Sequence, residues 1–196
     1  MTLAELIQEV YTITARSDRV DETASAIKSA TLKAHQSDFY YKDLYEVGVE
    51  FGTPSFLQSM DYRTLIPRWR AIKYLRKYDL ATLTPGTFLN LITPEGVMDR
   101  YNVEKANIYY VAGAYINIKA DTSEQGYLVG CYVNPDITSG GYNSWIALDH
   151  PYAIIFDAAA TVFKATGKDE EAAAYRGLVQ EQISMLRASN IIAEGY

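Results

Sequence analysis

The chain has 196 residues, of which 48% are hydrophobic and 21% charged, so its composition is that of a globular protein and excludes global disorder. Its single cysteine, Cys131, excludes an intrachain disulfide, and no apolar run approaches the roughly 18 residues of a membrane-spanning helix. The net charge of −6 argues against nucleic-acid binding through the overall field of the protein.

Two amphipathic helices are predicted at the start of the chain. Thr2 and Glu5 have the spacing of a capping box, and the first helix is expected to end near Arg16. Its apolar face would consist of Leu3, Leu6, Ile7, Val10 and Ile13. Ser17 and Asp18 offer an N-cap for the second helix. The face of that helix would consist of Val20, Ala24, Ile27, Thr31 and Ala34, and the short link predicts an antiparallel pair.

After His35 the hydrophobic period changes from helical to two, which predicts strands. The expected strands cover residues 45–51, 56–62, 68–78, two runs within 108–118, and 127–133. Gly113 separates the two runs and suggests a turn or bulge. Residues 84–86 (Thr-Pro-Gly) predict a turn, and residues 94–96 (Pro-Glu-Gly) predict a single helical turn.

The last fifty residues return to a helical pattern. Asp149 is the expected N-cap of a helix with Pro151 in its first turn. Its face would be Ile155, Ala158, Ala159, Val162 and Phe163, and Gly167 would end it as the C′ residue. A final helix would begin at Asp169 and bury Ala172, Tyr175, Leu178, Val179, Ile183 and Leu186. Residues 191–196 are expected to be a loose tail.

The sequence therefore predicts an α+β fold in which the N-terminal and C-terminal helix pairs form one helical bundle with an inserted β-rich lobe. The expected parts are residues 1–43, 44–147 and 148–196.

Few residues point to catalysis or to a cofactor. No nucleotide-binding glycine pattern occurs, and one cysteine with two histidines is too few for a zinc site. A hydrolase would pair Cys131 or a serine with His150, oriented by Asp149. A helix start at Asp149 explains the same residues, and Cys131 alternates with core residues of its strand. We therefore expect neither an enzyme nor a bound cofactor.

One stretch combines basic and aromatic residues, and it contains Arg63, Arg68, Trp69, Arg70, Lys73, Arg76 and Lys77. Segment 63–78 has three interpretations: a solvated sheet face with Trp69, Ala71 and Leu75 turned inward, a docking site for an acidic protein, or a site for single-stranded nucleic acid. The chain also holds 17 tyrosines, which suit either strands or protein interfaces. Several tyrosines in one concave site would instead indicate a small ligand-binding module.

Motifs at both ends of the chain follow a recognisable order. The first group is Met1-Thr2-Leu3-Ala4-Glu5-Leu6-Ile7, then Arg16-Ser17-Asp18 and residues 30–35. The second group is residues 132–136, Asp149-His150-Pro151, an alanine-rich helix, residues 167–170 and a closing helix. This order resembles the head–tail adaptor, or connector, proteins of tailed bacteriophages. The resemblance covers nearly the whole chain and is weak between residues 51 and 105.

The resemblance implies a structural protein of the virion neck, assembled in the host cytoplasm and not associated with a membrane. Such adaptors form a ring, commonly of twelve copies, below the portal protein and present a surface to the tail or nozzle. DNA passes through their channel without specific binding. By the same resemblance, residues 189–196 are expected to dock on the portal, with Ile191, Ile192 and Tyr196 as candidate contacts.

Overall fold

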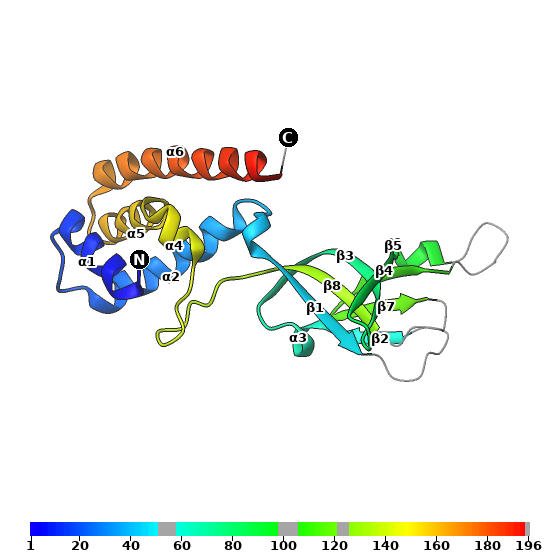
Figure 1. Ribbon diagram of the computed structural model, residues 1–196. Coiled ribbons are helices and arrows are strands. Elements are labelled where there is room, and N and C mark those ends of the chain that lie inside the picture. The colour runs from blue at the N-terminus through cyan, green and yellow to red at the C-terminus, as the bar shows by residue number, and fades with distance from the viewer. Residues whose placement is uncertain (51–57, 98–105, 121–125, 195–196) are drawn as a thin grey trace. The chain divides into compact units, whose positions relative to one another are not determined.

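The computed structural model describes residues 1–50, 58–97, 106–120 and 126–194. Its helices and two sheets confirm the predicted α+β class (Figure 1). Residues 1–43 and 134–196 form one compact unit, here the helical unit, and residues 44–133 form a second, here the β unit. The sequence placed the second boundary after residue 147, and it lies after Val133 because Ile146 and Ala147 are buried in the core of the helical unit.

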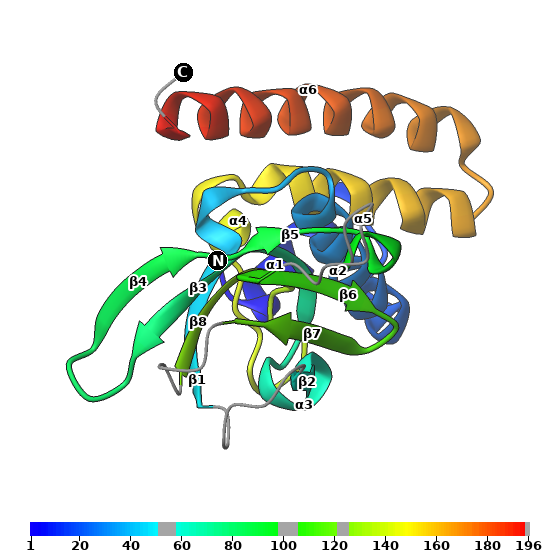
Figure 2. The same ribbon diagram turned by 90° about the vertical axis from the view of Figure 1, so that its right-hand side faces the viewer.

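The helical unit consists of α1 (Leu3–Thr14), α2 (Val20–Gln36), η1 (Tyr41–Asp43), α4 (Trp145–Asp149), α5 (Pro151–Ala165) and α6 (Asp169–Glu194). Helix α5 lies between α6 on one side and the α1–α2 pair on the other (Figures 1 and 2). Helix α5 is therefore the central element of this unit.

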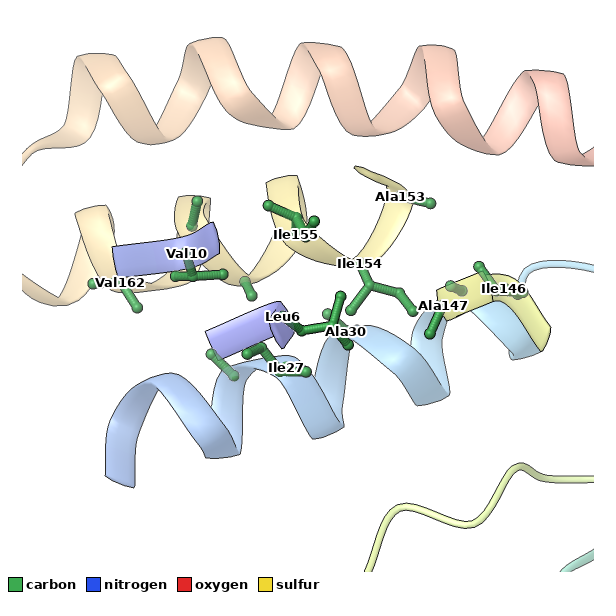
Figure 3. Packing of buried hydrophobic residues seen from close by; sticks show 14 of the residues in the cluster. Leu6, Val10, Ile27, Ala30, Ile146, Ala147, Ala153, Ile154, Ile155 and Val162 are labelled. Atoms are coloured by element: carbon green, nitrogen blue, oxygen red, sulfur yellow. The ribbon is translucent and has the colours of Figure 1, made fainter. Parts of the chain in front are cut away.

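The core of the helical unit is built from small and branched side chains (Figure 3). Leu6, Ile27 and Ile154 are fully buried at its centre. Alanines fill the positions where α2, α4 and α5 meet: Ala26, Ala30, Ala34, Ala147, Ala153, Ala158 and Ala159. Small side chains let helix backbones approach closely, so this alanine-rich core fixes α5 tightly against α2.

The two N-cap predictions at the start of the chain have different outcomes. The capping box of α1 is confirmed, since Glu5 Oε2 accepts from the Thr2 backbone N–H at 2.7 Å and Thr2 Oγ1 from the Glu5 N–H at 3.3 Å. The prediction for α2 is wrong. Arg19 occupies the N-cap without a side-chain capping hydrogen bond, and Asp18 instead pairs with the Arg16 guanidinium, whose hydrogen bond lowers the pKa of Asp18 to about 2.

The start of α5 also differs from the prediction. Asp149 does not cap α5 but ends the short helix α4, and α5 begins after His150 without a side-chain cap. The serine at position 144 caps α4 by accepting from the Ala147 N–H at 3.2 Å. Gly167 is confirmed as the residue that ends α5, with φ 76°. The prediction of a loose tail from residue 191 is wrong for the described residues, because α6 continues to Glu194.

The β unit contains two four-stranded sheets. The first has the order β1 (Leu44–Glu50), β8 (Gly126–Val133), β3 (Trp69–Asp79), β4 (Thr84–Phe88). The second has the order β2 (Gln58–Asp61), β7 (Tyr115–Lys119), β6 (Ile108–Ala112), β5 (Asn90–Leu91). All pairs are antiparallel except β5 with β6. Both sheets supply one core, which includes Leu75, Val129 and Cys131 from the first and Met60, Ile116 and Ile118 from the second.

Most of the predicted strands are present, and Gly113 forms the expected turn between β6 and β7, with φ 60°. The helical turn near residue 94 is η2 (Pro94–Val97), and α3 (Tyr62–Leu65) follows β2. The turn predicted at residues 84–86 is wrong. Those residues begin β4, an edge strand where Pro85 is tolerated, and the turn occupies residues 80–83. The expected residues Phe51 and Phe56 lie outside the described part of the chain.

Ile27 and Val20 were assigned to the same face of α2 but have opposite environments, since Ile27 is fully buried and Val20 is 54% exposed. We expect Ile27→Ala to lower the free energy of unfolding by about 2–5 kcal/mol, because it leaves a cavity in the core. Val20→Ala should change it by less than about 0.5 kcal/mol. Urea denaturation of both variants measures the difference, and equal losses would contradict this packing.

Candidate functional site

The basic residues of segment 63–78 are distributed over several elements of the β unit. Arg63 lies in α3, Arg68 in the turn before β3, and the others on β3 between β8 and β4. Of the three side chains expected to turn inward, Leu75 is fully buried, while Trp69 and Ala71 are partly exposed. The segment is therefore not one uniform basic face.

Three of these cations make contacts within the β unit. The Arg76 guanidinium donates to the Gly86 carbonyl at 3.0 and 3.2 Å and lies 4.6 Å from the centre of the Phe88 ring. Lys73 Nζ lies 5.6 Å from the centre of the Tyr132 ring, and Lys77 is only 8% exposed. These contacts and the burial of Lys77 indicate that Arg76, Lys73 and Lys77 have structural roles in the sheet.

The remaining arginines of the segment, Arg63, Arg68 and Arg70, lie near a stacked pair of aromatic rings. The rings of Tyr62 and Trp69 are stacked with centres 4.4 Å apart and an interplanar angle of 25°. The stack borders a hollow of about 780 Å³, here the apolar hollow, whose lining includes Ile72, Leu91, Ile92, Pro94 and Val111. It also borders a hollow of about 470 Å³, here the arginine hollow, lined by Ile66, Arg63, Arg68 and Arg70. Tyr62, Trp69 and Arg70 line both hollows.

One of the three arginines that line the arginine hollow forms an ion pair with a neighbouring carboxylate. Arg63 Nη2 lies 2.9 Å from Asp61 Oδ2, and the hydrogen bond from Arg63 lowers the pKa of Asp61, which therefore stays ionised at neutral pH.

Arg68 has an unusual backbone conformation. Its φ is +61°, in the left-handed region that favours glycine or asparagine. An arginine in that region carries strain on the order of 1 kcal/mol, and such strain is found most often at functional sites. The strain follows from the turn at Pro67 and Arg68 that leads into β3.

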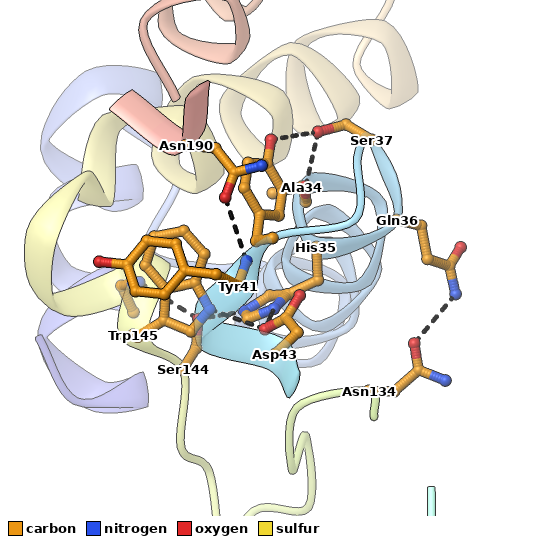
Figure 4. Close-up of polar contacts among 12 residues, drawn as sticks. Ala34, His35, Gln36, Ser37, Tyr41, Asp43, Asn134, Ser144, Trp145 and Asn190 are labelled. Carbon is orange, nitrogen blue, oxygen red and sulfur yellow. Dashed lines mark hydrogen bonds and ion pairs between the residues drawn. The ribbon is translucent and has the colours of Figure 1, made fainter. Parts of the chain in front are cut away.

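The predicted C-terminal site lies on the last turns of α6. The side chain of Ile191 is 52% exposed, whereas nothing is described for the side chains of Ile192 and Tyr196. Asn190 is buried and joins α6 to the segment after α2 (Figure 4). Its Oδ1 accepts from the Tyr41 N–H at 3.0 Å, and its Nδ2 donates to the Phe39 carbonyl at 3.3 Å.

A buried polar network in the helical unit was missed by the sequence analysis, which assigned His35 only to the end of its helix (Figure 4). His35 Nδ1 lies 2.8 Å from Asp43 Oδ1, and His35 Nε2 lies 2.9 Å from Ser144 Oγ. Trp145 Nε1 donates to the same Asp43 oxygen at 2.7 Å. His35 and Asp43 are eight residues apart and His35 and Ser144 are 109 apart, so no spacing in the sequence indicates the network.

The connectivity of this network is that of a hydroxyl, imidazole and carboxylate in a serine hydrolase. Ser144 is only 4% exposed, however, and its oxygen already accepts the capping bond from Ala147. An attacking hydroxyl needs space for a carbonyl group next to it. The arrangement therefore favours a structural role, in which the His35 ring bridges the Asp43 carboxyl group and the Ser144 hydroxyl.

The hydrolase residues suggested by the sequence have other contacts. Asp149 Oδ2 lies 2.6 Å from Lys42 Nζ. Cys131 is buried and its thiol donates to the Tyr45 carbonyl at 3.6 Å. Burial raises the pKa of Cys131 to about 11, so the thiol is protonated at neutral pH and is a poor nucleophile.

Among the described residues, no group of three or more histidine, cysteine or acidic side chains is arranged to bind a metal ion. Within the same residues, no helix combines the length and apolar character needed to cross a membrane.

Comparison with known proteins gives no relative from which to assign a function. No protein-family model matches the sequence, and no curated protein matches it.

Asp43 accepts two hydrogen bonds in the buried network, and we expect Asp43→Ala to lower the free energy of unfolding by about 3 kcal/mol, because both donors are left buried. The matched control is Asp149→Ala, which removes a partly exposed ion pair with Lys42 and should cost less than about 1 kcal/mol. Chemical denaturation of both variants provides the measurement. Similar losses would show that the network is not a main source of stability.

The strain at Arg68 predicts opposite effects for two glycine substitutions. Arg68→Gly should leave the free energy of unfolding unchanged or raise it by up to about 1 kcal/mol, because glycine tolerates positive φ. Arg70→Gly, within strand β3, should lower it by about 1 kcal/mol. Thermal or urea unfolding checks the signs, and a clear loss of stability in Arg68→Gly would contradict the strain.

Proposed function

We propose that this chain is a head–tail adaptor of a tailed bacteriophage, a non-catalytic protein of the virion neck. It forms a ring of about twelve copies below the portal, an expectation that rests on the resemblance. The ring extends the channel through which DNA passes and offers an attachment surface to the tail or nozzle. No cofactor is needed for this function, and assembly takes place in the host cytoplasm.

The observation that carries the proposal is that the two groups of adaptor-like motifs belong to one compact unit, apart from Tyr132 and Val133. Residues 1–7, 16–18 and 30–35 lie in the helical unit together with residues 134–136, 149–151 and 167–170, and Tyr132 and Val133 are the last residues of strand β8. The stretch of weak resemblance, residues 51–105, belongs to the β unit. Motifs from opposite ends of the sequence that fold together support a shared structural origin better than either group alone.

In this proposal the two units have different roles. Helices α1, α2, α5 and α6 act as the bundle of the adaptor, and the β unit acts as its inserted lobe. The net charge of −6 suits a channel protein, because a net acidic protein does not retain DNA through its overall field. The end of α6 docks on the portal, and the exposed Ile191 supplies apolar contact area there.

Nucleic-acid binding through segment 63–78 is less well supported, because Lys73 and Arg76 already contact groups of the β unit and Lys77 is buried. A small ligand-binding module is favoured by one observation, the apolar hollow beside Trp69, whose size is typical of small-molecule sites. Quenching of Trp69 fluorescence by a saccharide, abolished in Trp69→Leu, would support that alternative.

The experiment that tests the proposal mixes the purified chain with the portal protein encoded beside it. Size-exclusion chromatography with light scattering should detect a complex with one chain per portal subunit. Absence of a complex, with both proteins folded, would contradict the adaptor function.

We expect removal of residues 191–196 to abolish or strongly weaken portal binding without unfolding the helical unit. The truncation must keep Asn190, because its side chain holds the Tyr41 and Phe39 backbone groups. Ile191→Asp should weaken binding at least tenfold by placing a charge in the interface. The matched control is Leu148→Asp, which changes another exposed apolar side chain and should bind normally. Normal binding by the truncated chain would exclude this segment as the docking site.

A further inference from the structure

Strand β1 forms an open edge of the first sheet. The sheet has the order β1, β8, β3, β4, so β1 has a neighbouring strand on one side only. Its residues, Leu44–Glu50, pair with β8 in an unbroken antiparallel register. Every second residue of such a strand directs its N–H and C=O groups away from the paired neighbour. In the described part of the chain, no other segment supplies backbone partners for these outward groups.

The other edges of the two described sheets have features that discourage the addition of a strand. Strand β4 contains Pro85, which lacks an N–H group, while β2 has only four residues and β5 only two. Short strands, prolines and bulges are common protections of sheet edges. Strand β1 has seven residues and contains neither a proline nor a bulge. It is therefore the edge best suited to pairing with another chain.

Two carboxylates lie along the exposed face of β1. Side chains of a strand alternate between the two faces of its sheet. Val47 and Val49 pack in the core of the β unit, so Glu46 and Glu50 lie on the opposite face, and both are exposed. Within the residues that the structure describes, neither carboxylate has a cationic partner. The open backbone edge therefore carries two uncompensated negative charges.

The position of Glu46 is set by a tyrosine two strands away. Glu46 lies opposite Gly130 of β8, and Gly130 lies opposite Tyr74 of β3. Because Gly130 has no side chain, the Tyr74 ring lies across it, and a Cβ atom at Gly130 would overlap the ring. The Tyr74 hydroxyl donates to Glu46 Oε1. Burial and this hydrogen bond raise the pKa of Tyr74 to about 12, so the donor is uncharged at neutral pH and leaves the charge of Glu46 in place.

These charges determine which kind of strand can pair with β1. Like charges on paired strands destabilise the pair, and opposite charges stabilise it. Pairing β1 with the β1 of a second copy would bring Glu46 and Glu50 of both copies onto adjacent strands. A strand with lysine or arginine at alternate positions would instead place a cation near each carboxylate. The edge therefore disfavours a second copy and favours a basic partner.

We propose that β1 is a docking edge for an extended basic segment of another protein, which adds to the first sheet as a further strand. The backbone of the segment pairs with the outward N–H and C=O groups of β1. Its basic side chains, at every second position, lie beside Glu46 and Glu50. This inference goes beyond the adaptor function, because it concerns the β unit and does not depend on binding to the portal.

The test uses a labelled synthetic peptide of alternating valine and lysine, as long as β1. Fluorescence anisotropy measures its affinity for the whole chain, and hydrogen exchange measures the protection of amides 44–50. The lysine peptide should bind and slow the exchange of the outward amides of β1. A peptide with glutamate in place of lysine should bind at least roughly tenfold more weakly. A peptide with proline in place of valine keeps its charge but lacks backbone donors, and it should also bind at least roughly tenfold more weakly.

The matched variants remove charge while preserving the shape of the side chains. Glu46→Gln combined with Glu50→Gln leaves an amide oxygen that can accept from Tyr74, so folding is retained. This variant should bind the lysine peptide at least roughly tenfold more weakly than the unmodified chain. The control combines Glu170→Gln with Glu171→Gln, which changes the net charge equally at exposed positions on α6 and should bind normally. Circular dichroism of both variants verifies folding.

The proposal is overturned if the lysine peptide does not bind, if the proline peptide binds equally well, or if the α6 control loses as much affinity as the β1 variant. Protection of residues 44–50 that rises with protein concentration, without peptide, would also overturn it and identify a second copy as the occupant. Portal binding is measured separately. A chain that binds the peptide but not the portal refutes the adaptor function alone, and the reverse result refutes this docking edge alone.

Discussion

The helical unit depends most on the hydrogen bonds that the buried carboxyl group of Asp43 forms. Asp43 is the last residue before strand β1, and it receives hydrogen bonds from His35 at the end of α2 and from Trp145 at the start of α4. His35 in turn contacts Ser144, which caps α4. A single buried carboxyl group thus ties the residue where the chain leaves the helical unit to the start of α4. Burying a polar group is tolerable only when it is hydrogen-bonded in this way.

Much of the fold could be predicted from the sequence because its signals are local. The Thr2–Glu5 capping box, the helical spacing of Ile155 to Phe163, Gly167 and the alternation of Tyr127 to Val133 all correspond to observed elements. Predictions failed where two local signals competed. Asp18 could cap α2 or pair with Arg16, and the structure has the ion pair. Pro85 could mark a turn or an edge strand, and it lies in an edge strand.

The candidate sites were predicted only in part, because their geometry depends on contacts between distant segments. The sequence identified the arginines near Trp69 but not the stack with Tyr62 or the strained backbone of Arg68. It could not distinguish Arg76, which bonds to Gly86, from Arg63 at the arginine hollow. The His35 network was also missed, for lack of any spacing signal. Leu178 was assigned to the core of the last helix, but its side chain is 39% exposed.

The limited burial of α6 has a consequence for the dynamics of the helical unit. Among its described side chains α6 buries Ala172, Leu186 and Asn190, and Tyr175 and Ile183 add contacts with the core, whereas the shorter α5 buries eight side chains, so α6 is held less deeply than α5. Segments with few buried contacts open at free energies below that of global unfolding. Amide hydrogens of α6 should therefore exchange with solvent when the helix detaches locally. Those of α5 should exchange only when the whole unit unfolds cooperatively. A partner that binds only the attached helix would shift this equilibrium towards attachment, and a partner that binds only the detached helix would shift it the other way.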